Sequence, residues 1–151
     1  MRRIAMPAAL VFAGALALSG CAADGGDTAG SGADTCTTVA SEVRDISNGV
    51  QNTLASASST DEIETYLEDA QSRVDAAAEE AGDNEELSSA VDEFSSELEA
   101  VGEYAGGLTE APSEEDPSVT TLEQDPEELA EQQTAVQEAA GEVTAACGEE
   151  D

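Results

Sequence analysis

The sequence has no histidine, no tryptophan and only four basic residues, and these absences limit the chemistry open to it. Without histidine, neither a Ser-His-Asp nor a Cys-His triad can form, and metal sites built on histidine are excluded. No phosphate-binding glycine loop and no dinucleotide fingerprint occurs. Carboxylates abound, but nothing marks a sugar cleft of the kind that glycosidases need. We therefore expect no catalytic residue, no metal site and no cofactor, and a protein that is not an enzyme.

Positive charge is scarce beside 35 acidic residues, and the net charge is −31. Such a surface repels nucleic acids and anionic headgroups, so nucleic-acid binding is excluded. Acidic pairs four residues apart, such as Glu138 and Glu142, cost a few tenths of a kcal/mol each on a helix, and only Asp69 and Arg73 offset this in the favourable order. The acidity has two interpretations, which are solubility or adaptation to a saline setting, and low-affinity binding of calcium or magnesium.

The first twenty residues are typical of a secretion signal, because Arg2 and Arg3 precede an apolar run and small residues. The apolar run from Ile4 to Leu18 is about 15 residues, shorter than the roughly 20 that a transmembrane helix needs. A permanent transmembrane helix is therefore the weaker alternative. The residues that usually flank the arginine pair of a twin-arginine signal are missing, which favours general secretion.

A candidate lipid-attachment site follows the apolar run. The sequence Leu18-Ser19-Gly20-Cys21 resembles the bacterial lipobox, and the alternative is an ordinary cleavage site that precedes a cysteine. The resemblance implies that Cys21 is alkylated with diacylglycerol and that the signal, residues 1–20, is removed. The mature chain would keep two arginines against 35 acidic residues, a net charge of −33, and fatty chains such as palmitate would hold it at the membrane.

The mature chain divides into a tether and a helical domain. Residues 21–34 include Gly, Ser and Asp, which cannot build a core, and predict a flexible tether. Residues 35–148 predict a domain of four helices, since apolar residues recur at steps of three and four over 36–57, 59–81, 83–108 and 125–147. Gly49 should weaken the first helix by up to about 1 kcal/mol. We expect Tyr66 and Tyr104, which flank the apolar stripes, to pack rather than bind ligands.

The connections between the helices suggest how they are arranged. Residues 109–124 are acidic, contain two prolines and predict a long linker without strands, and residues 149–151 form an acidic tail. The other two connections are short, and each helix would be roughly 33 Å long. The expected fold class is therefore all-α, an antiparallel up-down-up-down four-helix bundle behind a flexible N-terminal tether.

The two remaining cysteines support an even number of helices. Cys36 lies in the first turn of the first expected helix, and Cys147 lies in the last turn of the fourth. Export permits a disulfide, and four antiparallel helices place these ends at one pole, whereas three would separate them by about 30 Å. Closing so long a loop would contribute about 4–5 kcal/mol. Two unpaired buried thiols are the alternative.

With one cysteine at each end of an alanine-rich helical domain, the chain over residues 36–147 resembles a type of small exported protein of actinobacteria. That type implies no particular activity. We expect a non-enzymatic, lipid-anchored protein of the cell envelope, a structural or interaction module on the outer side of the membrane with an envelope protein as its partner. The alternative function is that of a surface protein that binds calcium or magnesium weakly.

Overall fold

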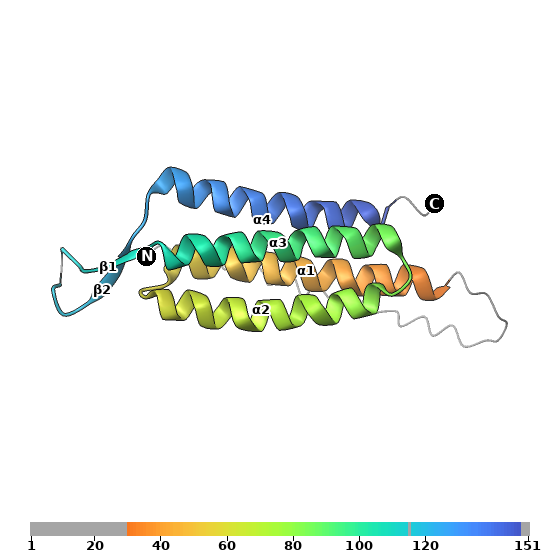
Figure 1. The fold of residues 1–151 in the computed structure, drawn as a ribbon, viewed down its shortest axis with the longest axis horizontal. Helices are drawn as coiled ribbons and strands as arrows, with labels where there is room; N and C mark the ends of the chain where they lie inside the picture. Colours follow the sequence, from red (N-terminus) through yellow and green to blue (C-terminus); the bar gives the residue numbers. More distant parts are fainter. Residues whose placement is uncertain (1–29, 115, 149–151) are drawn as a thin grey trace, which may run out of the picture.

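The computed structural model describes residues 30–114 and 116–148, which are mostly helical. The predicted signal (1–20), the lipobox with Cys21, most of the predicted tether and the acidic tail (149–151) lie outside the described residues. Figure 1 shows four long helices and a small two-stranded sheet. In chain order the elements are α1 (Gly30–Ser56), α2 (Thr60–Ala81), α3 (Glu85–Gly106), β1 (Thr109–Pro112), β2 (Thr120–Glu123) and α4 (Pro126–Ala146).

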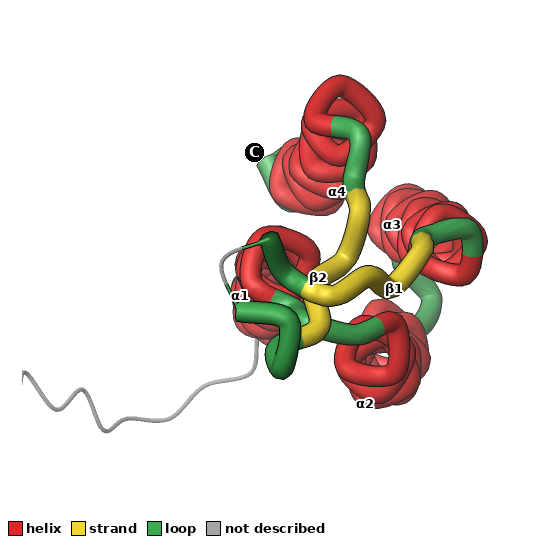
Figure 2. Tube along the Cα trace, turned by 90° about the vertical axis from the view of Figure 1, so that its left-hand side faces the viewer, coloured by secondary structure: helices red, strands yellow, loops and turns green. Residues whose placement is uncertain are grey.

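The four helices form a bundle around one core. Helix α1 packs against α2 and α4, and α3 packs against the same two helices, so the contacts close a ring. The end-on view in Figure 2 shows the helices around a common centre, with the strands across one end. Figure 1 shows the beginning of α1 and the end of α4 at the opposite end of the bundle from the strands.

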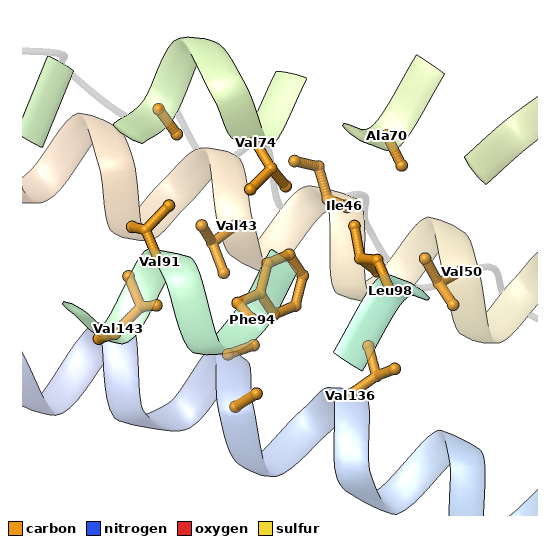
Figure 3. Close-up of a cluster of buried hydrophobic side chains, with 14 of the residues drawn as sticks. Val43, Ile46, Val50, Ala70, Val74, Val91, Phe94, Leu98, Val136 and Val143 are labelled. Carbon is orange, nitrogen blue, oxygen red and sulfur yellow. The ribbon is translucent and has the colours of Figure 1, made fainter. Parts of the chain in front are cut away.

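The core consists of the predicted apolar stripes and is built mainly from Val, Ala and Leu. Phe94 is the largest fully buried side chain, and Figure 3 shows it among valine and leucine side chains from the surrounding helices. Residues from all four helices contribute to the same cluster, so no helix buries its apolar face alone. The fully buried large residues are Phe94, Ile46, Leu54, Ile63, Leu87, Val39, Val43, Val50, Val74, Val91, Val101 and Val136.

Three of the helices begin after a residue whose side chain caps the first turn. Asp125 caps α4, because its carboxylate accepts from the backbone N–H groups of Glu127 and Glu128, and Pro126 stands at the start of the helix. Helix α3 is capped by Asn84, whose side chain accepts from the backbone N–H of Leu87 at 3.0 Å. At α2 the Glu62 carboxylate accepts from the backbone N–H of Ser58 at 2.7 Å. That residue lies one position before the Ser59 cap, so the reciprocal bond of an ideal capping box is displaced.

Helix α1 begins at Gly30, inside the segment predicted as the tether (21–34). The last five residues of that segment are therefore helical. Hydroxyl groups of the next turn fold back on them, since Thr37 donates to the carbonyl of Ala33 at 2.8 Å and Thr38 to that of Asp34 at 3.0 Å. Once the packed part of the helix has formed, each further residue adds a hydrogen bond without a new nucleation step. The amino-acid composition alone is therefore a poor predictor of the residue at which α1 begins.

The prediction of a strand-free linker over 109–124 was wrong. Strands β1 and β2 pair antiparallel, with Thr109 opposite Glu123 and Pro112 opposite Thr120. The tip of the hairpin is closed by Asp116, whose carboxylate accepts from the backbone N–H and the hydroxyl of Ser118. Asp and Ser favour such local turns, and the β-branched threonines suit paired strands. The acidic, proline-containing composition concealed both signals.

The hairpin is attached to the nearby ends of the first two helices. The Glu110 carboxylate accepts from the backbone N–H of Thr60 at 3.0 Å, at the start of α2. Gln124 donates from its side-chain amide to the carbonyl of Leu54 at 3.1 Å, at the end of α1. The hairpin therefore supplies partners for backbone groups that the helix ends leave unsatisfied.

Over the described residues, none of the helices combines the length and the apolar character required to cross a membrane.

Candidate functional site

A disulfide joins Cys36 of α1 to Cys147, the residue that ends α4. Their Cα atoms are 5.4 Å apart, within the usual range for a disulfide, and the bond closes a loop with a sequence separation of 111 residues. The predicted pairing is therefore confirmed. The other predicted site residues, Leu18, Ser19, Gly20 and Cys21, lie outside the described residues.

Both tyrosines pack against the core, but only one of their hydroxyl groups forms a hydrogen bond with another described residue. The Tyr66 hydroxyl donates to the carbonyl of Ile46 at 3.3 Å, and burial raises its pKa. The Tyr104 hydroxyl is buried and has no hydrogen-bond partner among the described residues. Burial raises the pKa of Tyr104, and the negative charges of Glu128 and Asp125 add to the shift.

Arg73 pairs with a different carboxylate from the one expected from the sequence. Its Nε donates to the carboxylate of Glu42 on α1 at 2.6 Å, so the ion pair joins α1 to α2. This hydrogen bond raises the pKa of Arg73, and the charge of Asp69 contributes less. Both side chains of the pair are about one-third exposed, so solvent screens the interaction. The pair is best described as a link between two helices with a modest contribution to stability.

Repulsion between carboxylates is most evident between α3 and α4. The negative charge of Glu93 raises the pKa of Glu142, and Glu138 adds to the effect. The sequence predicted the repulsion between Glu138 and Glu142, but the larger contribution comes across the helix interface. Among the described residues, no three or more His, Cys, Asp or Glu side chains are placed to hold a metal ion.

The described surface between α1 and α4 is hollowed and, unlike other hollows on the molecule, carries no acidic side chain in its lining. Two adjoining hollows of about 390 and 310 Å³ lie there, and Arg44 lines both. We call them together the α1–α4 groove. Its lining includes the disulfide at one end and amide or hydroxyl side chains from both helices at the other. Neither hollow is lined by an aspartate or a glutamate.

The sequence contained a signal for this groove that the apolar stripe obscured. Thr37, Ser41, Arg44, Asn48 and Gln51 follow one another at steps of three and four residues, so they form a second stripe beside the buried one. None of them is acidic. A carboxylate-free helix face in so acidic a chain therefore points to this surface.

Comparison of the chain with protein-family models, with curated proteins and with solved structures finds no match. The function of the candidate site is therefore inferred from its geometry and chemistry alone.

Proposed function

We propose that the protein is a lipid-anchored, non-enzymatic interaction module of the cell envelope, held on the outer side of the membrane through Cys21. The single observation that carries the proposal is the sequence Leu18-Ser19-Gly20-Cys21 behind a short apolar run. The disulfide between Cys36 and Cys147 supports it, because such bonds persist mainly outside the cytosol. The absence of histidine from the whole sequence supports a non-enzymatic role.

The proposal includes an antiparallel up-down-up-down order of the four helices. The short connections between α1 and α2 and between α2 and α3 support this order, as does the pairing of α1 with α4. The disulfide supports it further, since it joins the N-terminal part of α1 to the end of α4. In this arrangement the chain leaves the bundle toward the membrane beside the disulfide, and the β1–β2 hairpin lies at the far end.

Metabolic labelling tests the anchor directly. A palmitate analogue should label the full chain in a bacterial host and should not label Cys21→Ser. Cys36→Ser is the matched control, because it removes a cysteine outside the lipobox and should retain the label. Equal labelling of the wild type and Cys21→Ser would contradict the proposal, and so would unlabelled wild-type protein that is exported in quantity.

A second candidate function is weak calcium or magnesium binding by the acidic surface. The observation that favours it is the raised pKa of Glu142 beside Glu93, since a divalent cation near the pair would relieve their repulsion. Calorimetric titration of the full chain with calcium tests it. Heat that saturates, and that differs from the heat of a magnesium titration, would support a cation-binding function. The absence of binding heat for both ions would contradict it.

A further inference from the structure

The α1–α4 groove combines an unpaired cation with a lining free of carboxylates. Arg44 is exposed and forms no ion pair or hydrogen bond with another described residue. The other described arginine, Arg73, is engaged by Glu42. Three other hollows on the described surface each include carboxylates, for example Glu62 and Asp69 in one of them. Arg44 is thus free to meet a negatively charged group from outside the chain.

The charge of the protein limits what that group can be. A planar guanidinium can bind a carboxylate or a phosphate through two parallel hydrogen bonds. The chain carries a net charge of −31, and its field repels a doubly charged phosphate more strongly than a singly charged carboxylate. The balance between one local cation and the field of the whole molecule therefore favours a monoanionic carboxylate.

The second hollow of the groove is lined mainly by polar side chains and includes no aromatic ring. Asn48 and Gln51 of α1 face Gln137 and Thr144 of α4 across the second hollow. The side-chain amides of Asn48 and Gln137 form no hydrogen bond with another described residue, so they can pair with the N–H and C=O groups of a peptide backbone. The amide of Gln51 already donates to the hydroxyl of Ser47 at 3.3 Å, and the hydroxyl of Thr144 donates to the carbonyl of Ala140 at 3.2 Å. Ser47 is only 3% exposed and lines the same hollow, so a buried hydroxyl contributes to it. Neither hollow is lined by an aromatic ring on which a sugar could stack.

The dimensions also suit an extended chain. The groove runs along α1 from Cys36 to Gln51, which corresponds to roughly 22 Å of helix. An extended peptide of about six residues has that length. Gly141 lines the groove, and a Cβ placed on it would meet nothing within 4 Å, so space remains open there.

We propose that the α1–α4 groove binds a peptide with a free C-terminal carboxylate, which Arg44 holds while the amide and hydroxyl side chains pair with the peptide backbone. The proposal goes beyond the lipid-anchored module, and it does not depend on lipidation of Cys21. It assigns the interaction surface to a face of the bundle that the acidic charge leaves accessible to an anion.

Nuclear magnetic resonance titration of the ¹⁵N-labelled full chain in detergent tests the proposal. The probe is an acetylated alanine-serine hexapeptide with a free C-terminus, compared with the same peptide ending in an amide. The free acid should shift the backbone resonances of Arg44, Asn48, Gly141 and Thr144. The amide should bind about tenfold more weakly, because it loses the charge-assisted bonds to Arg44. Sodium glucuronate and inorganic phosphate are the comparison anions, at matched ionic strength.

Four variants separate the groove from a general charge effect. Arg44→Gln should remove the preference for the free acid, whereas Arg44→Lys should keep part of it. Gly141→Leu should fill the groove and abolish binding. Gly106→Leu is its matched control, because a Cβ at this exposed α3 position also meets nothing within 4 Å, and it should bind as the wild type does.

Several results would overturn the proposal. They are equal binding of the acid and the amide, unchanged binding by Arg44→Gln, shifts confined to residues outside the groove, or no binding of the hexapeptide at all. Tighter binding of glucuronate or phosphate than of the peptide would overturn the assignment of the ligand. Melting curves of each variant ensure that lost binding is compared between folded proteins.

Discussion

The hydroxyl group of Tyr66 lies directly over Gly49, in the space that a side chain at that position would occupy. A Cβ added to Gly49 would overlap the hydroxyl oxygen and would lie 2.5 Å from Cζ, the ring carbon that carries it. The same hydroxyl donates to the carbonyl of Ile46 one turn earlier in α1. Gly49 is therefore a notch in α1 that receives Tyr66 of α2, and this packing offsets its low helix propensity.

A double-mutant cycle tests the notch. In the wild-type background, Gly49→Ala should lower the free energy of unfolding by about 1–3 kcal/mol, because Tyr66 must leave its site. In a Tyr66→Ala background the same substitution should raise it by up to about 1 kcal/mol through helix propensity. Urea unfolding of the full chain, followed by circular dichroism, measures both. Gly141→Ala, at an open position, should stabilise both backgrounds alike. A stabilising effect of Gly49→Ala beside Tyr66 would contradict the notch.

Reduction of the disulfide should destabilise the bundle. The bond closes most of the described chain into one loop, so its loss restores much of the entropy of the unfolded state. We expect Cys36→Ser combined with Cys147→Ser to lower the free energy of unfolding by about 2–5 kcal/mol. Urea unfolding with and without reductant measures it. The double variant should be insensitive to the reductant, and a wild-type protein equally insensitive would show that the bond contributes little.

Glu142→Gln should raise the melting temperature at pH 7. The charge of Glu93 holds the pKa of Glu142 above its ordinary value, so protonation favours the folded state. The destabilisation is present at neutral pH and is relieved as the pH falls through the raised pKa. The benefit of Glu142→Gln should therefore disappear in that acidic range. Thermal melts from pH 7 to pH 4 measure it, with Asp92→Asn as the control because no acidic residue lies three or four positions from it.

The capping carboxylate of α2 should respond to pH in the opposite direction. The backbone hydrogen bond from Ser58 lowers the pKa of Glu62, so its contribution to stability is present above the ordinary carboxyl range and is lost as the pH falls through the lowered value. Glu62→Gln should thus flatten the acid limb of the stability curve. Melts between pH 5 and pH 2 measure it. An acid limb as steep as that of the wild type would count against the cap as its cause.

Salt should stabilise the protein. The negative charges lie within a Debye length of one another at 0.01 M salt, where that length is about 30 Å, and are largely screened at 0.15 M, where it is about 8 Å. The melting temperature of the full chain should therefore rise with sodium chloride. Calcium and magnesium should act at lower concentration than sodium at matched ionic strength. A melting temperature indifferent to all three salts would show that the acidic surface has no energetic effect.

The helical part of the fold was predictable because it depends on local periodicity. The stripes around Val43, Phe94 and Val136 are buried as their spacing indicates. The positions of Cys36 and Cys147 at the two ends of the helical domain predicted the disulfide between them. The hairpin was missed because its pairing and its anchoring to Thr60 and Leu54 depend on long-range contacts. Two other features also depend on long-range contacts. Arg73 forms its ion pair with Glu42 and not with Asp69, and Tyr66 packs over Gly49.

The covalent link between Cys36 and Cys147 also determines how the bundle carries a mechanical load. A pull on the chain ahead of α1 enters the packed domain at a residue bonded to the end of α4. The first and last helices are therefore loaded in parallel, and neither can be peeled from the core on its own. Fraying from the C-terminal end is restricted in the same way, since α4 cannot separate from α1 at that point. With the chain anchored through Cys21 as proposed, tension would enter the domain beside this bond, at the end of the bundle opposite the hairpin.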